Sequence, residues 1–196
     1  MAHLKFDLSK LERLNDPGRF DTMDPAVMWD ALGHPSPRVI VEIGAGTGLF
    51  AEKFAQLAPE AIVYAVDMAP EMVAWMTENR RDARGVDGAE PRLVPMLSTE
   101  TSVPLGDGVA DLVAMLNVHH ELAEPAATYA EAFRLLAPGG QVLVVDWAPK
   151  ETPKGPPLAI RATVAALDEV LEASGFCDVV AHEGLEWHSL LTARRP

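Results

Sequence analysis

The chain has 196 residues, of which 48% are hydrophobic, so its size favours one domain with a substantial core. The formal net charge of −13 and the pI of about 4.8 oppose binding to phosphate backbones or anionic lipid, so we expect neither nucleic acid nor stable membrane association. The start, MAHLKFDLSKLERL, lacks the apolar stretch of a signal peptide, and no run of about 18 apolar residues occurs, which predicts a soluble cytoplasmic protein.

The single cysteine, Cys177, excludes an intramolecular disulfide and a thiolate cluster for zinc. We expect its side chain to be a small buried hydrophobe.

Along the chain, short apolar runs alternate with segments of helical periodicity. Residues 1–35 predict two short helices, with NDPG (15–18) turning between them. The expected strands are 38–43, 61–67, a weaker one at 91–96, 109–117, 141–147, 177–183 and 186–193. The expected helices are 47–57, 70–84, 125–136 with a glycine stop at APGG, and 162–174 ending at Gly175.

Near-continuous apolar strands separated by amphipathic helices predict an α/β fold, with a doubly wound and mostly parallel sheet of seven strands. The last two strands are joined by a short turn at Gly184, so we expect them to be antiparallel. The Pro-rich stretch 149–157 is too short to divide two domains. We therefore expect a single domain, 1–196, made of an N-terminal helical segment (1–35), a core (38–147) and a C-terminal helix with a strand pair (148–196).

Three glycines at every second position follow the first predicted strand, in the sequence GAGTG (44–48). In parallel sheets this strand-to-helix turn commonly cradles a ligand. Leu49 stands where a dinucleotide fingerprint needs its third glycine, and no Gly-Lys-Ser/Thr of a P-loop follows. Glu42 would repel a phosphate but suits an ammonium group, and Asp67 lies 19 residues after Gly48, where an acid can bind a ribose diol. The pattern therefore predicts a ligand with a ribose, a cationic end and little phosphate.

These residues resemble the motifs of the class I S-adenosylmethionine-dependent methyltransferases, whose fold is Rossmann-like. The similarity lies in VEIGAGTG (41–48), YAVDMAPEMV (64–73), PLGDGVADLVAMLNVHHEL (104–122) and RLLAPGGQVLVVDW (134–147). It covers about residues 38–147. Within the class, the chain looks more loosely similar to small methyltransferases of the ubiquinone and menaquinone biosynthesis branch.

The resemblance implies S-adenosylmethionine as cofactor, with S-adenosylhomocysteine as product. It implies that Glu42 faces the methionine amine, that the glycine backbone approaches the cofactor, that Asp67 binds the ribose and that Met68 lies against the adenine, with core packing as the alternative for Met68. The implied cofactor-binding residues are Glu42, Gly44, Ala45, Gly46, Gly48, Asp67, Met68, Thr99 and Asn117. The acid with which relatives bind the adenine amino group is missing, and Ser98, Thr99 or Glu100 are left as candidates.

The acceptor is expected near the end of the fourth strand, where His119 and His120 are the candidate catalytic residues. If the strand continues, only one of them faces the ligand, and the resemblance favours His119. A helix-capping role is the alternative for His120. We expect no metal site, because adjacent residues diverge.

Other residues are candidate neighbours of the acceptor. Trp147 is expected to wall the pocket, and the N-terminal segment to form a lid from which Arg19 reaches a carboxylate, or else simply to cover the sheet. His188 is a possible pocket residue, although an exposed or structural position is favoured.

The sequence thus predicts a monomeric or homodimeric enzyme that transfers a methyl group to a small molecule by in-line displacement. A non-catalytic S-adenosylmethionine-binding or accessory protein of the same fold is the alternative. A nicotinamide oxidoreductase is disfavoured by Leu49 and Glu42.

Overall fold

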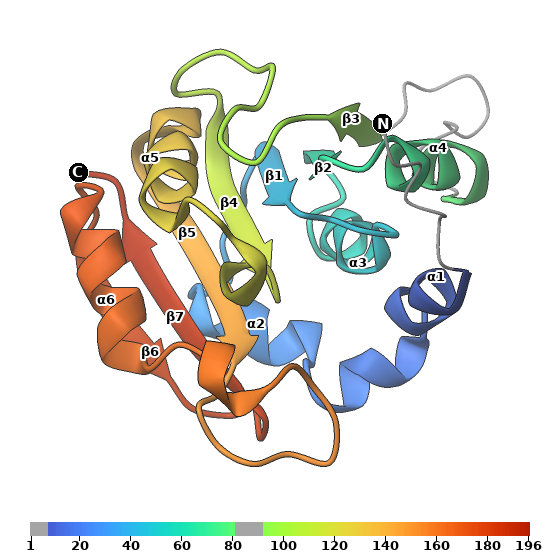
Figure 1. The fold of residues 1–196 in the computed structure, drawn as a ribbon. Coiled ribbons are helices and arrows are strands. Elements are labelled where there is room, and N and C mark those ends of the chain that lie inside the picture. The colour runs from blue at the N-terminus through green and yellow to red at the C-terminus, as the bar shows by residue number, and fades with distance from the viewer. Residues whose placement is uncertain (1–7, 81–91) are drawn as a thin grey trace.

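A computed structural model describes residues 8–80 and 92–196 and shows one twisted sheet with helices on both faces (Figure 1). The strand order is β3-β2-β1-β4-β5-β7-β6. The strands are β1 (Val39–Ile43), β2 (Ile62–Asp67), β3 (Leu93–Leu97), β4 (Ala110–Leu116), β5 (Leu136–Trp147), β6 (Cys177–His182) and β7 (His188–Arg194).

The first five strands pair in parallel, whereas β7 runs antiparallel to both β5 and β6. This arrangement confirms the predicted fold class. Because β1 lies between β2 and β4, the strand order reverses direction beside β1. Open α/β sheets bind ligands in the crevice at such a switch point.

Short helical segments precede the sheet, and longer helices connect its strands (Figure 1). The α-helices are α1 (Leu8–Leu14), α2 (Pro25–Ala31), α3 (Leu49–Leu57), α4 (Pro70–Asn79), α5 (Pro125–Leu135) and α6 (Val164–Ala173). The 3₁₀ turns are η1 (Pro17–Asp21), η3 (His119–Glu121) and η4 (Leu158–Ile160).

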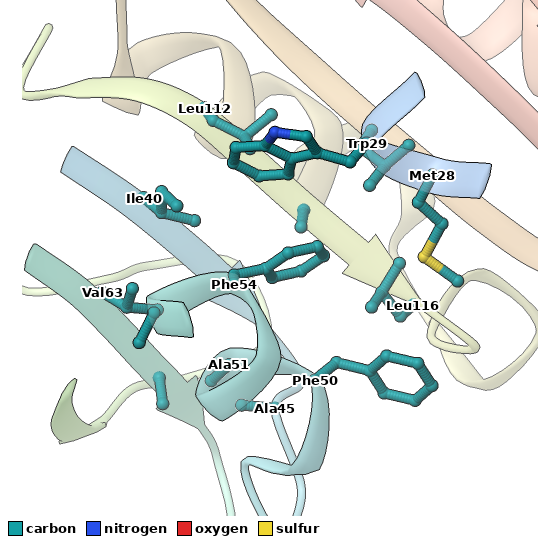
Figure 2. Packing of buried hydrophobic residues seen from close by; sticks show 14 of the residues in the cluster. Met28, Trp29, Ile40, Ala45, Phe50, Ala51, Phe54, Val63, Leu112 and Leu116 are labelled. Carbon is teal, nitrogen blue, oxygen red and sulfur yellow. The ribbon is translucent and has the colours of Figure 1, made fainter. Parts of the chain in front are cut away.

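Two apolar clusters fill the space between the sheet and its helices. Ile40 of β1 packs into the cluster beneath α2, α3 and α4, whereas its neighbour Val41 packs into the cluster beneath α5 and α6. This follows from the alternation of side chains along a strand. In the first cluster Phe54 of α3 contacts Trp29 of α2, with ring centroids 6.1 Å apart (Figure 2). Helix α2 is thereby held to the main core.

The structure differs from the expected elements at several ends. No helix extends to a glycine stop at APGG: α5 ends at Leu135, and residues 136–140 already belong to β5, where Leu136 pairs with Ala110. The pairing register shifts between Ala110 and Leu112, which accommodates these extra residues in the strand. Because Gly48 has a φ of 68° and caps α3, that helix begins at Leu49 and not at residue 47.

Three further expectations do not coincide with the elements and burial described in the structure. The N-terminal segment contains three helical pieces in place of two, because Asp16 caps the turn η1 between α1 and α2. Cys177 is half-buried and not fully buried, since it begins β6 at the edge of the sheet. The last residues of the helix expected at 70–84 lie outside the described residues, in which α4 ends at Asn79. Within the described ranges, none of the helices is long and apolar enough to cross a membrane.

The contact between α2 and α3 allows a direct test of how much packing in the first cluster contributes to stability. Phe54 is fully buried, so its replacement by Ala should lower the free energy of unfolding by about 3–5 kcal/mol. Leu57→Ala is the matched control on the same helix, because Leu57 is 38% exposed and should lose far less. Urea denaturation of both variants measures the difference, and equal losses would contradict the packing described.

Candidate functional site

A cavity of about 550 Å³ opens at the carboxyl ends of β1, β2 and β4. It is bordered by the glycine loop, by the segment after β3 and by the N-terminal segment, which we define as residues 8–32. The predicted cofactor residues that line it are Glu42, Gly44, Ala45, Gly46, Asp67, Met68, Thr99 and Asn117. Gly48 is not among its lining residues.

Gly44 and Gly48 of the loop allow two different close contacts. Gly44 has a φ of 72°, and a Cβ atom there would meet Cγ2 of Val118 at 2.5 Å, so a side chain is excluded by both backbone conformation and space. A Cβ atom on Gly48 would meet Sδ of Met76 at 2.9 Å. Gly44 therefore allows Val118 to pack against the loop, whereas Gly48 allows α4 to pack closely against it.

Asp67 fastens the glycine loop to the end of β2. Its Oδ2 accepts a hydrogen bond from the Gly46 N–H at 2.7 Å, and its Oδ1 accepts one from the Ala69 N–H at 2.9 Å. Each carboxylate oxygen has a second acceptor position. Asp67 lines the cavity, so it can hold the loop and still receive hydroxyl donors from a ligand.

Glu42 is a carboxyl group buried at the end of β1, with 2% of its surface exposed. Its Oε2 has no hydrogen-bond partner among the described residues. Burial raises the pKa of Glu42 to about 8, and the positive charges of Arg19 and Arg80 oppose this increase without cancelling it. A cation placed beside this buried carboxyl would favour its ionised form, so the site prefers a cationic group.

The N-terminal segment is tied to the glycine loop by polar contacts. The carbonyl of Leu14 accepts hydrogen bonds from the guanidinium of Arg19 at 2.9 Å and from the Thr47 hydroxyl at 3.1 Å. Arg80, which is 6% exposed, donates to the Thr47 carbonyl at 2.6 Å and to the Asn15 side chain at 2.6 Å. The segment therefore borders the cavity and is joined to the glycine loop, which fits both the predicted lid and its alternative, a simple cover over the sheet. The role of Arg80 was not predicted, because nothing in its sequence context distinguishes it from a solvated helix-end arginine.

Residues after β3 border the part of the cavity where adenine binding is expected. Ser98, Thr99 and Glu100 all line it. The Glu100 carboxylate accepts the Glu124 N–H at 2.7 Å, so it is already engaged at the start of α5. Met68 is 61% exposed and lines the cavity, which excludes the alternative that it is a core residue.

The two histidines after β4 face different surroundings. Asn117 has a φ of 57°, and the chain then forms the turn η3, so the strand alternation assumed from sequence does not apply. His120 lines the cavity, and its Nδ1 lies 2.8 Å from Oδ1 of Asp146. His119 lies outside the cavity lining, with its Nδ1 3.1 Å from the hydroxyl of the buried Tyr129. In this structure His120, and not the favoured His119, therefore borders the cavity.

Trp147 and His188 stand side by side on neighbouring strands and both line the cavity. Trp147 lines the cavity as predicted, and its ring centroid lies 4.4 Å from that of His188. His188 also lines the cavity, is 5% exposed and has no hydrogen-bond partner for either ring nitrogen among the described residues. Burial lowers its pKa to about 4, so the ring is neutral near pH 7. His188 is thus a pocket residue, not an exposed one.

The described residues were also compared with the requirements of a metal site. Across residues 8–80 and 92–196, no group of three or more His, Cys, Asp or Glu side chains is arranged to hold a metal ion.

A family model described as "Methyltransferase domain" matches residues 41–144, which span β1 to β5 and contain the glycine loop, Asp67 and both histidines. The chain belongs to this family. The resemblance to the class I S-adenosylmethionine-dependent methyltransferases is thereby confirmed.

Among curated relatives, a demethylmenaquinone methyltransferase of Thermus thermophilus is 31% identical over 121 residues, which is 61% of this chain and 51% of the relative. A malonyl-[acyl-carrier protein] O-methyltransferase of Geobacter sulfurreducens is 35% identical over 104 residues, which is 53% of this chain and 36% of the relative. The chain therefore spans about half or less of the length of these two relatives. A solved S-adenosylmethionine-dependent methyltransferase from Aquifex aeolicus superposes with a TM-score of 0.86 at 27% identity, covering 98% of this chain and 100% of that one.

The burial of Glu42 generates a prediction about pH. A folded-state pKa of about 8, above the ordinary 4.5, means that the native protein retains a proton that the unfolded chain releases between these values. Stability should therefore fall as pH rises through this window, by up to about 1.4 kcal/mol per pH unit from this group. Glu42→Gln lacks the titrating group, so its stability relative to wild type should increase from about pH 5 to about pH 9.

Urea denaturation at several pH values measures this difference. The exposed Glu60→Gln supplies the control, because it removes a carboxyl group from the surface. For each variant, the difference in unfolding free energy from wild type is followed against pH. If this difference were as independent of pH for Glu42→Gln as for Glu60→Gln, Glu42 would not carry a raised pKa.

Proposed function

We propose that this protein is an S-adenosylmethionine-dependent methyltransferase that acts on a small-molecule acceptor. The observation that carries the proposal is the buried, partly unpaired carboxyl of Glu42 beside a glycine loop held by Asp67. Membership of the methyltransferase family supports it. So do the names of the relatives, which include a demethylmenaquinone methyltransferase and an acyl-carrier-protein O-methyltransferase.

The residues of the cavity fit S-adenosylmethionine. Glu42 offers its free oxygen to the ammonium of the methionine part, Asp67 offers acceptor positions to the ribose hydroxyls, and Gly44 and Gly46 border the same cavity. Met68 and Thr99 line the cavity, and we assign them to the adenine. An anionic pyrophosphate would meet Glu42 and Asp67, which disfavours a dinucleotide.

The bound cofactor supplies an electrophilic methyl group, which an acceptor takes by in-line displacement. The chain's own contribution is to align the acceptor and exclude water. We assign the acceptor to the region bounded by Asn117, His120 and Trp147, which line the cavity beyond the glycine loop. The N-terminal segment covers this region, and the cavity volume of about 550 Å³ has to hold cofactor and acceptor together, which favours a small molecule.

The fold alone leaves the reaction open. The [4+2]-cyclase SpnF superposes on this chain with a TM-score of 0.71 at 18% identity, so the same architecture supports other chemistry. The non-catalytic binding protein is therefore kept as the second candidate. Incubation with methyl-labelled S-adenosylmethionine and a small-molecule extract separates the two, because only an enzyme transfers the label.

Ligand binding is the first experiment. S-adenosylmethionine and S-adenosylhomocysteine should raise the thermal midpoint of the protein, since a ligand at 100 times its Kd adds about 2.7 kcal/mol to the native state. NAD and NADP at the same concentrations should leave the midpoint unchanged. Failure of both sulfur nucleotides to bind would overturn the proposed function.

The contribution of Asp67 to ligand binding can be separated from that of the hydrogen bonds with which it holds the backbone. Asp67→Ala should weaken S-adenosylhomocysteine binding roughly 10- to 100-fold, because a hydrogen bond to a charged group contributes about 1.5–3 kcal/mol. Asp111→Ala is the matched control: Asp111 also accepts two backbone N–H groups, of Arg38 and Val39, at 2.7 and 3.0 Å, but it lies outside the cavity lining. Titration calorimetry should show normal affinity for the control, and equal affinities would remove Asp67 from the binding set.

A further inference from the structure

Asp146 lies beneath the cavity at the end of β5 and is 1% exposed. Its Oδ1 is 2.8 Å from Nδ1 of His120 and accepts the Trp147 N–H at 2.7 Å. Its Oδ2 accepts the backbone N–H of His120 at 3.3 Å. Both the ring and the backbone of His120 are thus held by one buried carboxylate.

This contact determines which nitrogen of His120 carries the hydrogen. A carboxylate only accepts hydrogen bonds, so Nδ1 must be the donor, and in the neutral ring Nε2 is then a bare acceptor. Within the described residues no hydrogen bond joins Nε2 to the protein, and the exposed Glu121 carboxylate stands 3.9 Å away. His120 lines the cavity, so its ring can offer a basic nitrogen to a ligand there.

We propose that Asp146 is a positioning residue that fixes His120 as a proton acceptor, and that the methyl acceptor is a phenolic hydroxyl compound. The inference rests on the proposed function and deepens it, because it names the acceptor class and the group that takes its proton.

The acceptor class follows from what each nucleophile needs. An aliphatic amine, with a pKa of about 10.4, is a cation near neutrality and would be repelled by the positive sulfonium of the cofactor, whereas a thiol with a pKa of about 8.5 ionises appreciably without help. A phenol with a pKa of about 10 keeps its proton near neutrality and gains most from a positioned imidazole. An aliphatic hydroxyl is too weak an acid for histidine to deprotonate efficiently. A fixed base with a bare nitrogen is therefore best matched to a phenol.

The proton step balances within this arrangement. The phenolic O–H bond breaks, its electron pair stays on the oxygen, and the proton binds the lone pair of His120 Nε2. The resulting imidazolium is stabilised by Asp146, which keeps its hydrogen bond from Nδ1. With S-adenosylmethionine bound, this oxygen would form a bond to the methyl carbon while the carbon–sulfur bond breaks and its electron pair returns to the sulfur.

Nitrogen NMR of the histidine rings tests the positioning role without any acceptor. His120→Gln identifies the His120 signals among those of the six histidines in the chain. Wild-type protein should show a protonated Nδ1 and a bare Nε2, and Asp146→Asn should raise the Nε2–H population, because its amide can donate to Nδ1. A wild-type ring protonated at Nε2 alone would overturn the assignment, even if the buried Asp146→Asn variant failed to fold.

Titration calorimetry on protein saturated with S-adenosylhomocysteine tests the acceptor class. The probe is unsubstituted phenol, whose pKa of about 10 keeps its hydroxyl protonated near neutrality, and toluene is its isosteric control without the hydroxyl. The phenol should bind at least ten-fold more tightly, and His120→Phe should abolish this preference while keeping its affinity for S-adenosylhomocysteine. Equal binding of the two probes, or an unchanged preference in His120→Phe, would overturn the phenol assignment.

These outcomes remain distinct from a failure of the proposed function. If S-adenosylhomocysteine does not bind wild-type protein, the proposed function fails, and the inference that rests on it fails too. If it binds but the phenol is not preferred, the inference alone fails.

Discussion

The position of β1 in the middle of the sheet is the constraint on which the site depends. β1 pairs with β2 through Ile43↔Val66 and with β4 through Ile43↔Met115, and apolar clusters cover both faces. A side chain near its end is therefore surrounded by protein. Glu42 occupies that position, so its carboxyl has little water, and the chain after it must turn sharply into α3. The charge preference and the glycine loop both follow from this one placement.

Two arginines, Arg19 of the N-terminal segment and Arg80 at the C-cap of α4, act electrostatically on the buried carboxyl of Glu42. Arg19 and Arg80 both oppose the rise in the pKa of Glu42, and burial in turn lowers the pKa of each arginine. These guanidinium groups are also held by hydrogen bonds to backbone carbonyls, at Leu14 for Arg19 and at Thr47 for Arg80. Their positions are thus fixed by the fold. A small cationic ligand group meets a carboxyl whose surroundings are already organised.

The sequence allowed the sheet and the cofactor cradle to be predicted because their signals are local. Apolar runs, helix periodicity and the spacing from Gly48 to Asp67 depend on neighbours along the chain. The histidine turn was not predictable in this way. Whether His119 or His120 faces the ligand depends on the left-handed conformation of Asn117 and on a contact with Asp146, which is 26 residues away in sequence. The burial of His188 likewise depends on β7 pairing with β5, where it stands opposite Trp147.

Arg80 links parts of the chain that the sequence keeps far apart. Its guanidinium bonds Asn15 across 65 residues, Thr47 across 33 and Glu52 across 28. Contacts of such separation form late, because the loops between them must close first. The cover over the cavity and the loop beneath it therefore share one anchor, and local unfolding that releases Arg80 would loosen both as a single cooperative unit.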